Sequence, residues 1–244
     1  MKVAVCISGL PRSGVQGRDL RINHALLKRN FPTADFYFAS WQGQEHVVEK
    51  YFPDERVVFF SEPAMLYHPF VDTPSNIIDT SKYHKTVRQA KENTTFYNTS
   101  YHQNKQIIAH ALLVKQLPKT YDVIVRSRFD TVTFSEANFD TYIQNSYDNQ
   151  QAIGFATLRQ DWNEFDRPHE IATKSEYHYR FLFDQLIIHS ANIFDPEYVV
   201  NLHQEKILLP AEFGWWQVLS KDDNHRNISG WANPDKSIES RYLK

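Results

Sequence analysis

The stretch from Tyr121 to Phe134, YDVIVRSRFDTVTF, constrains the fold more than any other part of the sequence. Its first half, residues 121–125, is a short apolar run rich in β-branched residues, which is typical of a strand buried on both faces. Arg126, Arg128 and Asp130 follow at once. Because charged side chains are rarely buried without partners, this cluster predicts either a local Arg–Asp salt bridge or a charged ligand beyond the end of the strand.

Length and composition set broad limits on the fold and on the partners. The 244 residues suffice for one large domain with a full hydrophobic core. Basic and acidic residues number 27 and 29, so no overall basic surface is expected and no stable nucleic-acid partner either. The single cysteine, Cys6, cannot form an internal disulfide, which favours a reducing compartment.

We expect no transmembrane segment, because no apolar run approaches the roughly 20 residues that a spanning helix needs. The first residues also lack the long apolar region of a signal peptide, so the expected location is cytoplasmic. The sequence leaves the oligomeric state open.

A second transition from apolar to polar residues opens the chain. Residues 2–7, KVAVCI, predict a buried strand, and Ser8, Gly9, Leu10 and Arg12 lie in the turn that follows, SGLPRSG. Glycine lets main-chain amides approach a ligand, and the start of a following helix favours phosphate. The turn matches neither a Walker A motif nor GxGxxG, so a plain strand-to-helix turn and an anion site both stay open.

The rest of the chain alternates between strand-like and helix-like patterns. Further strands are predicted at 35–41, 56–60, 121–126 and 152–156, and helices at 18–30, 47–52, 101–117, 138–147, 196–203 and 210–219. A long insert that covers the site as a lid is expected at about 63–98, and a polar tail from about 221. The pattern predicts a single α/β domain over residues 1–244.

Two further polar segments are candidates for chemistry. Asp184 lies between hydrophobic residues on both sides in YRFLFDQLIIH, where a carboxylate is costly unless it is hydrogen-bonded or functional. A structural cap and a catalytic role both fit this position. The loop 159–175 carries His169 and Glu170 but lacks the second histidine of HExxH, which favours a solvated loop over a metal site.

Three stretches in this order resemble the GT-A-type glycosyltransferase-like proteins of polysaccharide and lipopolysaccharide synthesis, which also occur in large viruses and phages. They are VAVCISGLPRS at 3–13, DFYFASW at 35–41 and YDVIVRSRFD at 121–130. A fourth, FDQLIIHS at 183–190, falls where that group has an Asp-Gln pair before a strand. The resemblance extends from residue 2 to about 220 and implies a GT-A-like, Rossmann-like sheet, mixed and mostly parallel, flanked by helices.

The resemblance also implies an activity, the transfer of a sugar from a nucleotide-sugar donor to a hydroxyl of a carbohydrate-type acceptor. In such enzymes a DxD motif holds Mn²⁺ or Mg²⁺ on the diphosphate, and Asp130 is the one aspartate at that position here. The donor would lie against Ser8, Gly9, Leu10, Arg12, Arg126 and Arg128. The general base would be Asp184 or, as a second choice, Glu212. The donor sugar, its base, the acceptor and the stereochemical outcome stay open.

Two other functions remain as alternatives. Residues 9–14, GLPRSG, are also similar to the phosphosulfate loop of sulfotransferases, with Arg126 and Ser135 in the places of that family's arginine and serine. Val15 stands where that family has Thr or Ser. The third reading is a non-catalytic glycan-binding protein that keeps the fold.

Overall fold

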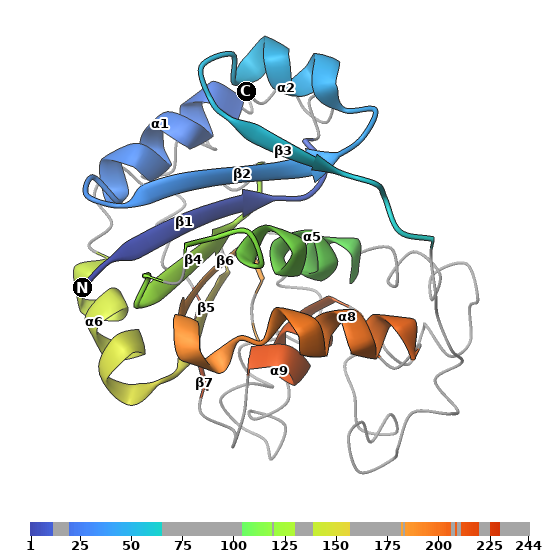
Figure 1. The fold of residues 1–244 in the computed structure, drawn as a ribbon. Coiled ribbons are helices and arrows are strands. Elements are labelled where there is room, and N and C mark those ends of the chain that lie inside the picture. The colour runs from blue at the N-terminus through green and yellow to red at the C-terminus, as the bar shows by residue number, and fades with distance from the viewer. Residues whose placement is uncertain are drawn as a thin grey trace, which may run out of the picture.

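One central sheet organises the computed structural model of the 244-residue chain (Figure 1). The structure describes residues 1–11, 20–64, 104–118, 120–129, 139–156, 184–205, 211–219 and 225–229, together with residues 182 and 208. Seven strands of these residues form the sheet, in the order β3-β2-β1-β4-β6-β5-β7.

The sheet is mixed and mostly parallel, as predicted. Its strands are β1 (Val3–Ser8), β2 (Asp35–Trp41), β3 (Val57–Phe60), β4 (Val123–Ser127), β5 (Ala152–Ala156), β6 (Leu186–Ser190) and β7 (His225–Ser229). Pairing is parallel between β1 and β2, β2 and β3, β1 and β4, and β5 and β7. The exception is β6, which runs antiparallel to both β4 and β5. The run that the sequence predicted as central is β4, the middle strand.

Helices cover both faces of the sheet (Figure 1). The helices are α1 (Leu20–Asn30), α2 (Glu45–Tyr51), α5 (Asn104–Val114), α6 (Asp140–Asn149), α8 (Pro196–Gln204) and α9 (Ala211–Leu219), with a short 3₁₀ turn, η4 (Ala191–Ile193). Buried side chains of α1, α2 and α6 share a core with one face of the sheet, and those of α5, α8 and α9 lie against the other.

Strand alternation explains why β4 reads as a continuous apolar run. Val123 and Val125 belong to the core on the α1 and α6 side, whereas Ile124 belongs to the cluster that contains α5. A strand with helices on both faces needs apolar residues at every position. By the same alternation, Arg126 falls on the α5 side of the sheet.

Several predicted segments can be compared with the structure only in part. The expected insert at 63–98 lies outside the described residues from residue 65 onward, as does the loop 159–175. Residues 225–229 of the expected polar tail form β7, a strand that the sequence analysis did not anticipate. In the described part of the chain, no helix combines the length and apolar character needed to cross a membrane.

Candidate functional site

The carboxyl ends of β1 and β4 lie next to each other. Ile7 of β1 pairs with Ser127 of β4 in parallel register, so the last residue of β1, Ser8, lies at one edge of the sheet, and Gly9 and Arg128 come directly after it. In open α/β sheets, ligands bind in the crevice beyond this edge. The two apolar-to-polar transitions of the sequence therefore meet at one edge.

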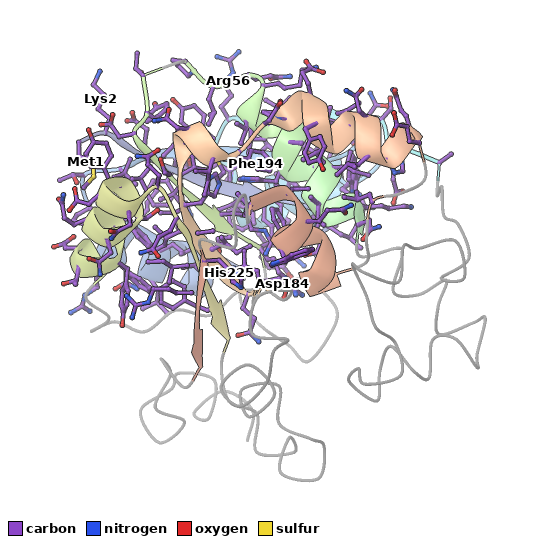
Figure 2. All side chains as sticks on the ribbon, turned by 90° about the horizontal axis from the view of Figure 1, so that it is seen from below. Met1, Lys2, Arg56, Asp184, Phe194 and His225 are labelled. Carbon is purple, nitrogen blue, oxygen red and sulfur yellow. The ribbon has the colours of Figure 1, made fainter. Side chains whose placement is uncertain are left out.

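Asp184 reaches the same edge from the opposite direction. Because β6 is antiparallel to β4, its first residue, Leu186, pairs with Ser127, the last residue of β4. Asp184 lies two residues before Leu186 and is half-buried. Figure 2 shows Asp184 well apart from Met1 and Lys2, which precede β1. The candidate base and the candidate donor turn thus share one edge of the sheet.

The turn after β1 is held by its own backbone geometry. Gly9 has a φ of +115°, which residues with a side chain rarely adopt. Its N–H donates to the carbonyl oxygen of Ala39 at 3.2 Å, and its own carbonyl accepts from Oγ of Ser40 at 3.1 Å. A Cβ atom added at Gly9 would lie 3.8 Å from Cγ of Gln106, an ordinary contact. The requirement for glycine therefore comes from the backbone angle and not from lack of space.

Arg126 is buried, although it comes from the end of a strand. Its side chain is 0% exposed. One terminal nitrogen, Nη1, donates to the main-chain oxygen of Asp184, and the other, Nη2, donates to Oε1 of Gln106 at 2.6 Å. The centre of the guanidinium lies 4.7 Å from the centre of the Trp215 ring. One side chain therefore joins β4, α5, α9 and the segment that leads into β6.

The remaining predicted residues differ in how far the structure describes them. Leu10 is 44% exposed, Ser8 is 1% exposed and Arg128 is half-buried. The hydroxyl of Ser8 has no hydrogen-bond partner among the described residues. Arg12, Asp130 and the side chain of Glu212 lie outside the described part of the chain. The described geometry thus covers Ser8, Gly9, Leu10, Arg126, Arg128 and Asp184.

One polar residue at this edge, Gln106, was missed by the sequence analysis. Gln106 contacts Arg126, and Lys105 forms a salt bridge with Glu62 at 2.6 Å after β3. Gln106 and His110 are four residues apart and therefore share a face of α5. Two polar residues on an otherwise apolar helix face signal buried hydrogen bonds, and this pattern was available in the sequence.

A cavity of about 490 Å³ opens at the opposite end of β4. It is lined by Tyr121 and Ile124, by the end of α5 with the residues that follow it, and by residues around the start of α8. The lining residues of the last two groups are Val114, Lys115, Leu117, Pro118, Ala191, Asn192, Phe194, Pro196 and Glu197. None of the predicted site residues that the structure describes lines it, so it is separate from the edge that carries Gly9 and Asp184.

The described side chains at the end of β4 include no carboxylate, so a divalent metal ion there would depend on Asp130. Mn²⁺ and Mg²⁺ prefer oxygen ligands from carboxylates, carbonyls and water. Here the described side chains are the guanidinium groups of Arg126 and Arg128 and the hydroxyl of Ser127. Within the described ranges, no group of three or more His, Cys, Asp or Glu side chains is arranged to hold a metal.

Comparison with known proteins supports the fold. No protein-family model and no curated protein matches the sequence. The chain is similar in structure to 4-diphosphocytidyl-2C-methyl-D-erythritol synthase from Anaerococcus prevotii, with a TM-score of 0.50, 10% identity and coverage of 99% of this chain and 93% of that one. It also matches core-mannan synthase A from Aspergillus fumigatus, in a form with Mn and GDP, at a TM-score of 0.46 and 10% identity over 93% and 73% of the two chains.

A third match is mouse xyloside xylosyltransferase 1, with a TM-score of 0.42, 10% identity and coverage of 93% and 84%. At such identities a likeness shows the fold alone, and among these three only the first reaches a TM-score of 0.50. Together with the strand order, it confirms the predicted GT-A-like, Rossmann-like fold.

Proposed function

We propose that this protein is a glycosyltransferase that moves a sugar from a nucleotide-sugar donor to a hydroxyl of a carbohydrate-type acceptor. The observation that carries the proposal is the meeting of the Gly9 turn, Arg128 and Asp184 at one carboxyl edge of the sheet. Transfer needs groups that stabilise the leaving diphosphate and a base for the acceptor. This edge supplies candidates for both from different strands.

The donor side of the proposed site consists of the Ser8–Leu10 turn with Arg12 and Arg128. Arginine suits this position because its planar fork of donors matches two phosphate oxygens at once. The turn is tied to β2 through both main-chain groups of Gly9, so its position is fixed before a ligand arrives. The N–H of Gly9 is already engaged with Ala39, which leaves the N–H of Leu10 as the candidate donor to a phosphate. The guanidinium of Arg126 is buried, which favours a position beneath the donor-binding residues and not among them.

On the acceptor side, Asp184 is the first candidate for the base and Glu212 the second. The carboxylate would take the proton of the acceptor hydroxyl while that oxygen forms a bond to the anomeric carbon of the sugar. The bond between this carbon and the diphosphate oxygen breaks, and the nucleoside diphosphate leaves with the electron pair. The cations of the donor side stabilise the charge that develops on the leaving group.

Asp130 is the one residue that we propose as a ligand of a divalent ion, Mn²⁺ or Mg²⁺. One carboxylate together with the diphosphate oxygens could hold such an ion and share the charge with Arg128.

A cytoplasmic location is also part of the proposal and is supported by Cys6, whose thiol is buried and free.

The proposal is tested by measuring which ligand raises the melting temperature. The panel contains UDP-, GDP- and dTDP-sugars, CTP, the sulfate donor 3′-phosphoadenosine 5′-phosphosulfate, and glycans without a nucleotide. At about 100 times its dissociation constant, the correct donor adds about 2.7 kcal/mol to the free energy of unfolding. For a chain of this size, that shifts the melting temperature by about 5–10 °C.

A shift with one nucleotide sugar, followed by release of the nucleoside diphosphate when an acceptor glycan is added, is the expected result. The variant Arg128→Gln is the control and should lose most of the shift. A shift with the sulfate donor alone would instead indicate a sulfotransferase. A shift with glycans and no nucleotide would indicate a glycan-binding protein, and a shift with CTP alone a nucleotidyltransferase.

A further inference from the structure

We propose that Arg126 is a positioning residue that holds the Asp184 segment and α9 against β4 and does not contact the donor. The inference deepens the proposed function, on which its catalytic part rests. It departs from the sequence analysis, which assigned Arg126 to the diphosphate together with Arg128.

The described contacts of the Arg126 side chain are all with other parts of the protein. Its side chain is 0% exposed, and its two terminal nitrogens donate to different segments, the main chain at Asp184 and the side chain of Gln106. The guanidinium also lies 4.7 Å from the centre of the Trp215 ring, within the range of a cation–π interaction. A guanidinium with both terminal nitrogens and a ring contact engaged inside the protein offers no surface to a diphosphate at the sheet edge.

The hydrogen bond to Asp184 fixes more than one atom. Because the peptide group is planar, holding the oxygen of Asp184 also orients the peptide plane between residues 184 and 185. The chain on either side is anchored, since Leu182 is 0% exposed and Leu186 pairs with β4 and β5. Arg126 thus fixes the short stretch between these anchors, and with it the direction in which the Asp184 side chain leaves the backbone.

The ring contact extends the same restraint to α9, the helix that carries the second candidate base. Trp215 is 1% exposed and lies three residues after Glu212 on α9, so the two residues are neighbours on the helix. An arginine is a costly way to fill a core, where an apolar side chain of similar volume often packs as well. What arginine adds is a directed hydrogen bond to the Asp184 backbone, and we infer that this geometry is its function.

The proposal predicts opposite behaviour for two arginines that are two residues apart. Arg126→Lys keeps the charge but loses the planar fork, and Arg126→Met keeps neither. In both variants we expect kcat to fall about 10–100-fold, because a small misplacement of a catalytic group costs that much. The donor KM and the nucleotide Kd should stay within about twofold. Arg128→Gln, the matched control, should instead raise the nucleotide Kd about tenfold or more.

Hydrogen–deuterium exchange gives a readout that does not depend on activity. The amides of residues 184–186 should exchange at least about tenfold faster in Arg126→Lys and Arg126→Met than in the wild type. In Arg128→Gln their exchange rates should stay unchanged. A double-mutant cycle adds a catalytic readout: in the Asp184→Asn background, Arg126→Lys should lower kcat by less than about twofold, since there is no base left to position.

Two results would overturn the proposal. One is a nucleotide Kd that rises tenfold in Arg126→Lys while the exchange rates of residues 184–186 stay unchanged. The other is a kcat of Arg126→Lys equal to that of the wild type. If Arg126→Met does not fold, Gln106→Leu replaces it, because it removes one partner of the guanidinium and should show the same pattern at smaller size. A wild-type protein that binds no nucleotide sugar would refute the proposed function. The exchange comparison of Arg126→Lys with Arg128→Gln would still decide the positioning role.

Discussion

Asp184 has two separate groups at the proposed site, its backbone carbonyl and its carboxylate. The carbonyl accepts from Arg126, whereas the carboxylate belongs to a half-buried side chain at the sheet edge. A change of the side chain alone leaves the backbone hydrogen bond in place. Stability and catalysis can therefore be separated at this residue.

Asp184→Asn should lower kcat by about 10²–10⁴-fold, the usual contribution of a positioned base, and leave the melting temperature and the nucleotide Kd nearly unchanged. Melting and turnover are measured on the same preparation. Asp195→Ala is the control, because the Asp195 carboxylate caps α8 by accepting from the N–H of Glu197 at 3.0 Å. That variant should lose about 1 kcal/mol of stability and keep its turnover. A destabilised but fully active Asp184→Asn would transfer the base role to Glu212.

Asp130 tests whether a metal takes part. We expect Asp130→Ala to lose turnover and to bind the nucleotide equally with and without Mn²⁺, while the wild type binds it more tightly with Mn²⁺. Asp130→Asn should keep the fold, because a residue beyond a strand end contributes little packing. Calorimetric titration of the nucleotide with Mn²⁺ and with EDTA provides the measurement. Normal turnover by Asp130→Ala would remove this residue from the site.

The direction of the Arg126 side chain and its partners could not be predicted from the sequence. A cation after a buried strand predicts a polar strand end, and that part was correct. Whether the side chain turns outward to a ligand or inward to the protein depends on partners that are far away in the chain. Those partners lie 58 and 20 residues from Arg126, at Asp184 and Gln106. A strand pattern has no information about such contacts.

At the scale of elements, the apolar patterns predicted most of the sheet and its helices. β1, β2 and β4 are recognisable because strands covered on both faces need apolar residues throughout. β7 was missed because its sequence, HRNIS, contains one apolar residue and pairs in the described sheet with β5 alone. In β7, His225 is buried and Arg226 is exposed, an alternation too short to recognise in a polar tail.

The positive φ of Gly9, directly after β1, leads to a prediction for this residue. Gly9→Ala should lose about 1–3 kcal/mol of stability, because alanine is strained at a φ of +115°. Gly43→Ala is a matched control: Gly43 has a φ of +88°, and nothing lies within 4 Å of an added Cβ. Both variants should unfold at lower urea concentrations, but only Gly9→Ala should weaken nucleotide binding. Equal effects on the nucleotide Kd would argue against a donor site at the Gly9 turn.

At the scale of the whole molecule, a pair of buried histidines links α5 to the sheet. Nε2 of His110 lies 3.3 Å from Nε2 of His189, and both side chains are 0% exposed. Nδ1 of His189 is 2.9 Å from the carbonyl oxygen of Ser190, which can only accept, so Nδ1 carries the proton. Nε2 of neutral His189 is then the acceptor, and Nε2 of His110 donates to it. This hydrogen bond requires Nε2 of His189 to be unprotonated, so His189 is neutral. Burial, together with His189 and Arg126, favours the neutral form of His110 as well.

Burial lowers the pKa of His189 to about 4, and burial together with His189 and Arg126 lowers the pKa of His110 well below its ordinary value. The unfolded chain binds protons at both rings below about pH 6.5, whereas the folded chain does not. Stability is therefore complete above pH 6.5 and falls by about 1.4 kcal/mol per pH unit for each histidine, until His189 is protonated in the folded state near pH 4.

Urea unfolding at pH 7.5, 6.5, 5.5 and 4.5 measures this loss against that of a double variant, His110→Gln with His189→Gln. Carboxylates contribute to acid unfolding in both proteins, so the difference between the two pH slopes isolates the histidine pair. We expect the wild type to lose about 2–3 kcal/mol per pH unit more than the double variant between pH 6.5 and 4.5. Equal slopes for the wild type and the double variant would mean that the pair is charged or solvated in the folded protein. The packing between α5 and the sheet would then differ from that described above.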